Sequence, residues 1–198
     1  MDLFSAEARL QSIPIEDGEL AMLAQLPLPI PNADVLRRLV DETPWRHETV
    51  VVYGKRHLQP RLTACYGDAG YTYSGLTLAP LPMTPLLRQL HAAVEEVTER
   101  RYNSVLLNYY RDGADSMGMH SDDERELGPE PAIASLSFGA SRTFILRHKA
   151  SKRTVKFDLT DGSLLLMAGS LQTHWVHGIN KTAKPTGPRV NLTFRTIG

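Results

Sequence analysis

The sequence has a single cysteine, no net charge and no long apolar run. Cys65 cannot form a disulfide within the chain, which suits a reducing compartment. Lysine and arginine (22) balance aspartate and glutamate (22), which excludes the overall basic charge of many nucleic-acid-binding proteins but allows a local basic patch. No apolar run approaches the roughly 20 residues that cross a bilayer. The N-terminal stretch MDLFSAEARL also lacks the layout of a signal peptide. We expect a monomeric, cytoplasmic protein without a membrane partner.

Several signatures of other enzyme classes are missing. The chain has no phosphate-loop pattern, no GxGxxG and no CxxC pair, so nothing supports nucleotide hydrolysis, dinucleotide redox chemistry or zinc-finger folding. It also has no internal repeat. Its 198 residues, 42% hydrophobic and 22% charged, are enough for one domain with a substantial core.

Two segments have the residue pattern of helices. In residues 32–45, NADVLRRLVDETPW, we expect Asn32 to be the N-cap and Pro44 to stop the helix. In residues 84–101, TPLLRQLHAAVEEVTERR, Thr84 can cap and Pro85 suits the first turn. Apolar residues three and four apart give this second segment one continuous apolar face.

Short strands dominate the rest of the chain. Closely spaced strands without intervening helices favour a jelly-roll barrel or sandwich. We therefore predict an α+β fold in one domain, with an N-terminal wrap and helix in residues 1–44, strands again in 48–67, and a jelly-roll core in 103–197. The strands expected in that core cover residues 104–110, 133–138, 142–148, 154–159, 163–168 and 189–195.

The stretch GMHSDDERE, residues 118–126, contains a histidine and a carboxylate at positions i and i+2. In an extended segment His120 and Asp122 point to the same side and can supply two metal ligands. A second histidine would complete the two-histidine-one-carboxylate set of Fe(II) oxygenases, which leaves coordination positions open. Both His174 and His177 in QTHWVHGIN are candidates. The alternative is a solvated loop, which the neighbouring acids would also suit.

The segment RVNLTFR, residues 189–195, alternates polar and apolar side chains. Its polar face is either wet or, in a closed barrel, directed into the lumen. Two arginines in a lumen would need anionic partners, because an unpaired buried charge is very costly. Such a strand can hold a small dicarboxylate through guanidinium forks. Asn108 and Tyr110 in LLNYYRDG alternate in the same way and can add hydrogen bonds.

These segments together resemble the AlkB family of Fe(II)- and 2-oxoglutarate-dependent nucleic-acid demethylases. The resemblance rests on Asn-x-Tyr, His-x-Asp, a distal histidine and Arg-x-Asn-x-Thr-x-Arg, in that order, and spans about residues 45–197. It implies a double-stranded β-helix (jelly-roll) core, buttressing N-terminal helices and a nucleotide-recognition hairpin region in residues 45–80. The family pattern Trp-x-His favours His177 over His174 as the third ligand.

The resemblance also implies residue roles. Iron would be bound by His120, Asp122 and His177, which are also the catalytic residues. Residues implied for 2-oxoglutarate are Asn108, Tyr110, Arg189, Asn191, Thr193 and Arg195. Residues implied for the nucleic-acid substrate are Val52, Tyr53, Gly54, Arg61, Tyr71, Tyr73, Ser74, Asp123 and Glu124.

The implied reaction is oxidative demethylation of N-alkylated bases in DNA, and in RNA as an extension. Fe(II), 2-oxoglutarate and O₂ would oxidise the methyl group, and formaldehyde, succinate and CO₂ would leave. 1-Methyladenine and 3-methylcytosine are cationic, so aromatic faces and carboxylates would stabilise them. Their methyl groups lie on the Watson–Crick edge, so access requires a single strand or a flipped base.

Two basic runs are candidates for backbone contacts. Lys55, Arg56 and Arg61 lie near the proposed hairpin and are expected to meet phosphate, while residues 147–153, RHKASKR, either do the same or form a solvated loop. Two other functions stay open: a non-catalytic nucleic-acid-binding module on the same fold, and a dioxygenase directed at RNA or protein.

Overall fold

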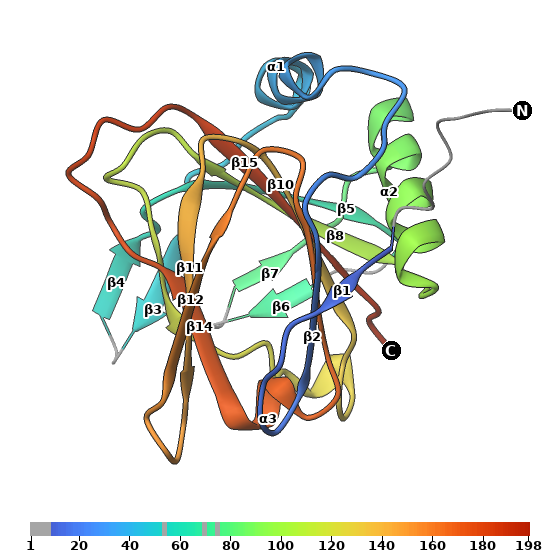
Figure 1. Ribbon diagram of the computed structural model, residues 1–198. Helices are drawn as coiled ribbons and strands as arrows, with labels where there is room; N and C mark the ends of the chain where they lie inside the picture. Colours follow the sequence, from blue (N-terminus) through green and yellow to red (C-terminus); the bar gives the residue numbers. More distant parts are fainter. Residues whose placement is uncertain (1–8, 53–54, 69–70, 74–75) are drawn as a thin grey trace, which may run out of the picture.

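The computed structural model describes residues 9–52, 55–68, 71–73 and 76–198, and two antiparallel sheets form its body (Figure 1). The larger sheet has the strand order β1-β2-β13-β10-β15-β8-β5, and the smaller has the order β12-β11-β14-β9. Two hairpins, β3-β4 and β6-β7, stand apart from both sheets. Together the two main sheets give the predicted jelly-roll α+β fold, which is confirmed.

The elements have the following bounds. The larger sheet contains β1 (Gln11–Ser12), β2 (Glu19–Leu23), β5 (Leu62–Gly67), β8 (Ser104–Tyr110), β10 (Ile133–Gly139), β13 (Leu164–Ala168) and β15 (Arg189–Arg195). The smaller sheet contains β9 (Met117–His120), β11 (Arg142–His148), β12 (Thr154–Leu159) and β14 (Trp175–Ile179). The hairpins are β3 (Thr49–Val52) with β4 (Lys55–Leu58), and β6 (Tyr71–Tyr73) with β7 (Leu76–Leu78). The helices are α1 (Asn32–Glu42), α2 (Pro85–Thr98), the short α3 (Leu171–His174) and the 3₁₀ turn η1 (Arg125–Leu127).

The larger sheet extends beyond the range expected for the core. Strand β2 pairs with β13 through Leu20↔Met167 and Ala21↔Leu166, and β5 pairs with β8. The N-terminal segment, residues 1–44, therefore supplies strands β1 and β2 to this sheet in addition to helix α1. These strands are too short and too mixed in sequence to stand out by alternation.

Helices α1 and α2 cover the outer face of the larger sheet (Figure 1). Val35 and Leu39 of α1 and Leu87 and Leu90 of α2 belong to the same buried cluster as Leu192 of β15. A second buried cluster, with Phe144, Leu165 and Trp175, lies on the other side of the larger sheet and includes residues of the smaller sheet. No helix in the described part of the chain is long and apolar enough to cross a membrane.

The helix ends confirm one prediction and correct another. Thr84 caps α2, because its Oγ1 accepts a hydrogen bond from the Leu87 N–H at 3.2 Å. The prediction of Asn32 as N-cap is wrong, since Pro31 occupies that position and makes no side-chain cap. The Asn32 carboxamide instead donates to Asp161 at 3.1 Å, in the turn before β13.

Candidate metal centre and adjoining cavities

Three predicted ligands meet where the neighbouring strands β9 and β14 of the smaller sheet pair. His120 at the end of β9 lies directly opposite His177 on β14, and the two ring centroids are 4.4 Å apart. Asp122 follows two residues after β9, with Oδ1 3.6 Å from His120 Nε2 and Oδ2 3.9 Å from His177 Nε2. One ligand atom from each residue lies within 4.8 Å of the others. Two imidazoles and a carboxylate in this arrangement fit a divalent iron ion.

A glycine beside His177 allows this close pairing of β14 and β9. A Cβ on Gly178 would lie 2.8 Å from the Met117 carbonyl oxygen and 3.0 Å from that of Gly118. The backbone of β9 could not stay in place against such a side chain. Gly178 is therefore required for His120 to face His177.

His174, the other candidate for the third ligand, belongs to a different group. Its ring stacks on His148 at 6.0 Å, and His148 Nε2 lies 3.1 Å from Asp17 Oδ2. The Ser151 N–H donates to His148 Nδ1 at 3.0 Å, so the proton of the neutral ring is on Nε2 and points to Asp17. In this tautomer both ring nitrogens of His148 are engaged, so His148 has no free lone pair to offer a metal ion.

Charge stabilises Asp122 as a carboxylate. Arg195 of β15 donates to its Oδ1 at 3.0 Å, and both side chains are almost fully buried. Burial alone would raise the pKa of Asp122, but Arg195, His120 and His177 outweigh it and lower the pKa to about 2. The carboxylate is therefore ionised and ready to bind a cation at neutral pH.

His177 is buried in its neutral form. Burial and the neighbouring His120 lower its pKa to about 3, in spite of Asp122. Its ring stacks on Phe144 at 5.3 Å, and Nδ1 has no hydrogen-bond partner among the described residues. Neutral imidazole is the form that binds metals.

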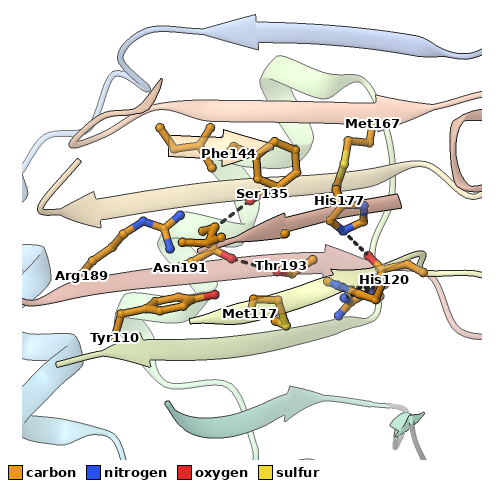
Figure 2. A pocket seen from close by; sticks show the side chains of 15 residues that line it. Tyr110, Met117, His120, Ser135, Phe144, Met167, His177, Arg189, Asn191 and Thr193 are labelled. Atoms are coloured by element: carbon orange, nitrogen blue, oxygen red, sulfur yellow. Dashed lines mark hydrogen bonds and ion pairs between the residues drawn. The ribbon is translucent and has the colours of Figure 1, made fainter. Parts of the chain in front are cut away.

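A row of polar side chains leads away from the triad along β15. Figure 2 shows Arg189 at one end of the cavity and the two histidines at the other, with Asn191 and Thr193 between them. All seven residues of β15 are buried, so the polar face lines the lumen and is not wet. Asn191 donates to Ser135 Oγ at 2.8 Å, and Thr193 donates to Asn191 Oδ1 at 3.1 Å.

Arg189 carries a buried charge that no described carboxylate neutralises. Its Nη2 donates to Ser137 Oγ at 2.9 Å and its guanidinium lies 5.0 Å from the Tyr110 ring centre. Nε and Nη1 are buried without a hydrogen-bond partner in the described part of the chain. Burial lowers the pKa of Arg189. A buried guanidinium with two unused donors fits a carboxylate ligand such as that of 2-oxoglutarate.

A second, larger cavity opens on the other side of the triad. It has a volume of about 570 Å³ and is lined by His120, Asp122, Asp123, Glu124, Gln59 and Arg61, among others. Asp123 pairs with Lys149 at 3.6 Å. Three of the predicted substrate residues, Arg61, Asp123 and Glu124, are therefore in the wall of one cavity with two metal ligands.

Arg61 and Asn108, which were expected to bind substrate and 2-oxoglutarate respectively, contact each other. Arg61 is only 4% exposed, and its Nε donates to Asn108 Oδ1 at 2.7 Å. This contact places Arg61 in the wall of the larger cavity, and its expected contact with phosphate stays a prediction. Asn108 contacts Arg61 and, unlike Tyr110, is not part of the lining of the Arg189 cavity.

Some predicted substrate residues are outside this description. Tyr53, Gly54 and Ser74 lie outside the described residues. Val52 ends β3, and Tyr71 and Tyr73 belong to β6. Their roles remain predictions.

Sequence reasoning missed several supporting residues. Ser135 and Ser137 alternate in the buried strand IASLSF, a signal that could have placed them in the lumen beside Asn191. Gln172 accepts a hydrogen bond from the Asp122 N–H at 3.0 Å, and no sequence spacing points to it.

The chain matches known proteins over most of its length. Residues 23–195 match the 2OG-Fe(II) oxygenase superfamily. DNA oxidative demethylase ALKBH2 of Mus musculus is 50% identical over 158 residues, which cover 75% of this chain and 66% of that protein. Alpha-ketoglutarate-dependent dioxygenase alkB homolog 3 of Homo sapiens is 44% identical over 173 residues, covering 82% of this chain and 60% of that protein.

A solved structure agrees in fold. The structure of OsALKBH1 has a TM-score of 0.66 with this chain at 18% identity, and the match covers 94% of this chain and all of the other. In sequence, the chain spans 66% of the mouse ALKBH2, 60% of the human one and 57% of the Bos taurus one. The superfamily match and the identity to these relatives show that the chain belongs to the AlkB family of 2-oxoglutarate- and Fe(II)-dependent dioxygenases.

Proposed function

We propose that this protein removes methyl groups oxidatively from N-alkylated bases of the 1-methyladenine and 3-methylcytosine type in DNA. The observation that carries the proposal is the His120–Asp122–His177 triad, with His120 partly exposed and the other two buried, which lies between a cavity with an unneutralised arginine and a larger cavity with acidic walls. The first cavity suits an anionic co-substrate and the second a cationic base. Relatives named DNA oxidative demethylase support the same reaction.

Under this proposal His120, Asp122 and His177 hold Fe(II). Arg189 binds one carboxylate of 2-oxoglutarate with its two unused donors, and Tyr110, Asn191 and Thr193 line the rest of its site. Arg195 holds Asp122 ionised and in place. When bound, iron and 2-oxoglutarate activate O₂ for oxidation of the methyl carbon; formaldehyde, succinate and CO₂ are the expected products.

The acidic wall gives the methylated base its electrostatic fit. A base methylated at a ring nitrogen of its Watson–Crick edge is cationic, and the carboxylates of Asp123 and Glu124 in the cavity wall would attract it. The salt bridge from Lys149 to Asp123 is long and partly exposed, so a cationic base can displace it. Val52, Tyr53, Gly54, Arg61, Tyr71, Tyr73 and Ser74 complete the proposed substrate site.

Surface cations supply contacts to the nucleic-acid backbone. Arg147, Lys152 and Arg153 are exposed at the β11–β12 turn, which projects from the smaller sheet in Figure 1. Arg56 is exposed on β4. Such contacts position a strand without reading its sequence.

One panel of substrates tests the proposal. Iron-loaded protein is incubated with 2-oxoglutarate and oligonucleotides that carry 1-methyladenine or 3-methylcytosine in single-stranded DNA, duplex DNA and RNA. Mass spectrometry then measures the restored base, and a separate assay measures formaldehyde. We expect repair of DNA, and its loss in His120→Ala and Asp122→Ala.

The other outcomes decide between the alternatives. Binding of methylated DNA without succinate formation would indicate a non-catalytic module. Succinate formation with repair of RNA alone would move the substrate to RNA. Retention of full activity in Asp122→Ala would overturn the ligand assignment.

A further inference from the structure

Gln59 is held rigidly by its backbone between β4 and β5. Its N–H donates to the Glu48 carbonyl at 2.9 Å, and its own carbonyl accepts from the Arg61 N–H at 2.8 Å. The same carbonyl lies 2.7 Å from His47 Nε2. Pro60 follows and has a fixed φ, so the proline and these contacts together constrain the backbone at Gln59.

Gln59 belongs to the wall of the larger cavity, and its carboxamide has no hydrogen-bond partner in the described part of the chain. The residue is 2% exposed, and both Nε2 and Oε1 are buried and unpartnered. Other polar residues of this wall have partners, such as Arg61 with Asn108 and Ser121 with the Trp175 carbonyl. A buried carboxamide without partners destabilises a fold, so its presence points to a ligand.

We infer that Gln59 reads the edge of the base and makes the site selective for methylated adenine over methylated cytosine. The inference rests on the proposed function, because it assigns specificity within the same cavity. A glutamine presents a donor and an acceptor side by side, which match the adenine N7 acceptor and N6 amino group. A methyl group on N1 leaves both of these groups free.

Methylated cytosine offers Gln59 fewer hydrogen-bonding groups than methylated adenine does. Its N3 methyl separates the N4 amino group from O2, and the carbon next to N4 on the other edge carries no polar atom. Gln59 can then make one hydrogen bond to cytosine but two to adenine. The second bond should appear as a preference of about tenfold for the adenine lesion.

The test replaces the carboxamide with an apolar side chain of similar length, Gln59→Met. Binding of single-stranded oligonucleotides with one 1-methyladenine or one 3-methylcytosine is measured by fluorescence anisotropy, with Mn²⁺ in place of iron and 2-oxoglutarate present. We expect the ratio of the two Kd values to fall about tenfold, mainly through weaker binding of the adenine lesion. Gln25→Met, at an exposed glutamine with hydrogen bonds to Asn32, is the control and should leave the ratio unchanged.

Thermal unfolding separates a ligand-reading role from a structural one. Since Gln59→Met removes an unsatisfied buried carboxamide, the free protein should gain about 2–4 °C in Tm. An unchanged ratio of Kd values would overturn the inference whichever way Tm moves. With a loss of Tm it would show a structural role for Gln59, and with a gain it would show that the carboxamide contacts only water. Binding selectivity that responds to Gln59→Met while wild-type protein repairs neither lesion would support the inference and overturn the proposed reaction.

Discussion

The carboxamide oxygen of Gln172 accepts a hydrogen bond from the backbone N–H of Asp122 at 3.0 Å. Gln172 belongs to α3 and is fully enclosed, and the neighbouring Ser121 hydroxyl donates to the Trp175 carbonyl at 2.9 Å. The α3–β14 corner therefore fixes the chain on both sides of the Ser121–Asp122 peptide bond. The same corner leads directly to His177, so one short segment orients two of the three proposed metal ligands.

Gln172→Leu should weaken metal binding. The substitution leaves the Asp122 N–H buried and unsatisfied, which costs about 1–3 kcal/mol and frees the carboxylate to move. Loss of a residue that orients a ligand typically lowers metal affinity about 10–100-fold. Isothermal titration with Mn²⁺ measures the change, and Thr173→Ala, at the exposed neighbour on α3, is the control. Equal affinities in both variants would rule out this role for Gln172.

The two arginines of β15 should respond in opposite ways to replacement by methionine. Arg195→Met removes the partner of the buried Asp122 carboxylate, which should destabilise the metal-free protein by about 3–5 kcal/mol. Arg189→Met removes a buried cation without a carboxylate partner, so stability should be kept or should rise by about 1–4 kcal/mol.

Urea unfolding of the two metal-free variants makes this comparison. Arg189→Met should also lose 2-oxoglutarate binding in the presence of Mn²⁺, measured by isothermal titration, although its fold is intact. A destabilised Arg189→Met variant that still binds 2-oxoglutarate would show that Arg189 has a structural role and does not bind the co-substrate.

Gly178→Ala should separate β9 from β14. The new Cβ would meet two carbonyl oxygens of β9 at 3.0 Å or less, so His120 must move away from His177. We expect a loss of stability of about 1–3 kcal/mol and a lower affinity for Mn²⁺. Gly118→Ala is a close control, since a Cβ there has nothing within 4 Å. Wild-type affinity in Gly178→Ala would mean that the strands tolerate the wider spacing.

The alternation in RVNLTFR predicted which side chains share a face, but not what covers the polar face. Val190, Leu192 and Phe194 join the cluster under α1 and α2, as the pattern indicates. The burial of Arg189 and Asn191 depends on the smaller sheet, which is built from strands remote in sequence. Local periodicity therefore identified the strand, and only the closed fold decides between a wet face and a lumen.

The same limit applies to the ligands and their supports. His174 and His177 were both candidates from their own sequence, and the path of α3 into β14 separates them. Gln59 and Gln172 carry no spacing signal, because the evidence for each is a contact, or a missing contact, with remote segments. Helix α1 was predicted from its end signals, Asn32 and Pro44, but the cap itself was wrong, since the Asn32 side chain donates to the remote Asp161.

Glu95 should make stability dependent on pH in the acid range. Its carboxylate accepts from the Tyr102 N–H at 2.9 Å and from Arg101 at 2.6 Å. Burial acts to raise the pKa of Glu95, but these hydrogen bonds and His91 lower it below its ordinary value of 4.5. The unfolded chain thus binds a proton more readily than the native one. The contribution of Glu95 is present above the unfolded pKa and is lost as pH falls through the native pKa.

Glu95→Gln tests this assignment. At neutral pH the variant should be less stable than wild type by about 1 kcal/mol, because the amide keeps one acceptor oxygen but no charge for Arg101. The difference should shrink as the pH falls below 4.5, where the wild-type carboxylate becomes protonated. Urea unfolding followed by circular dichroism at a series of pH values measures it, with Glu96→Gln, at an exposed position of the same helix, as control. A stability difference that is the same at neutral pH and at about pH 3 would show that packing, and not ionisation, is what Glu95 contributes.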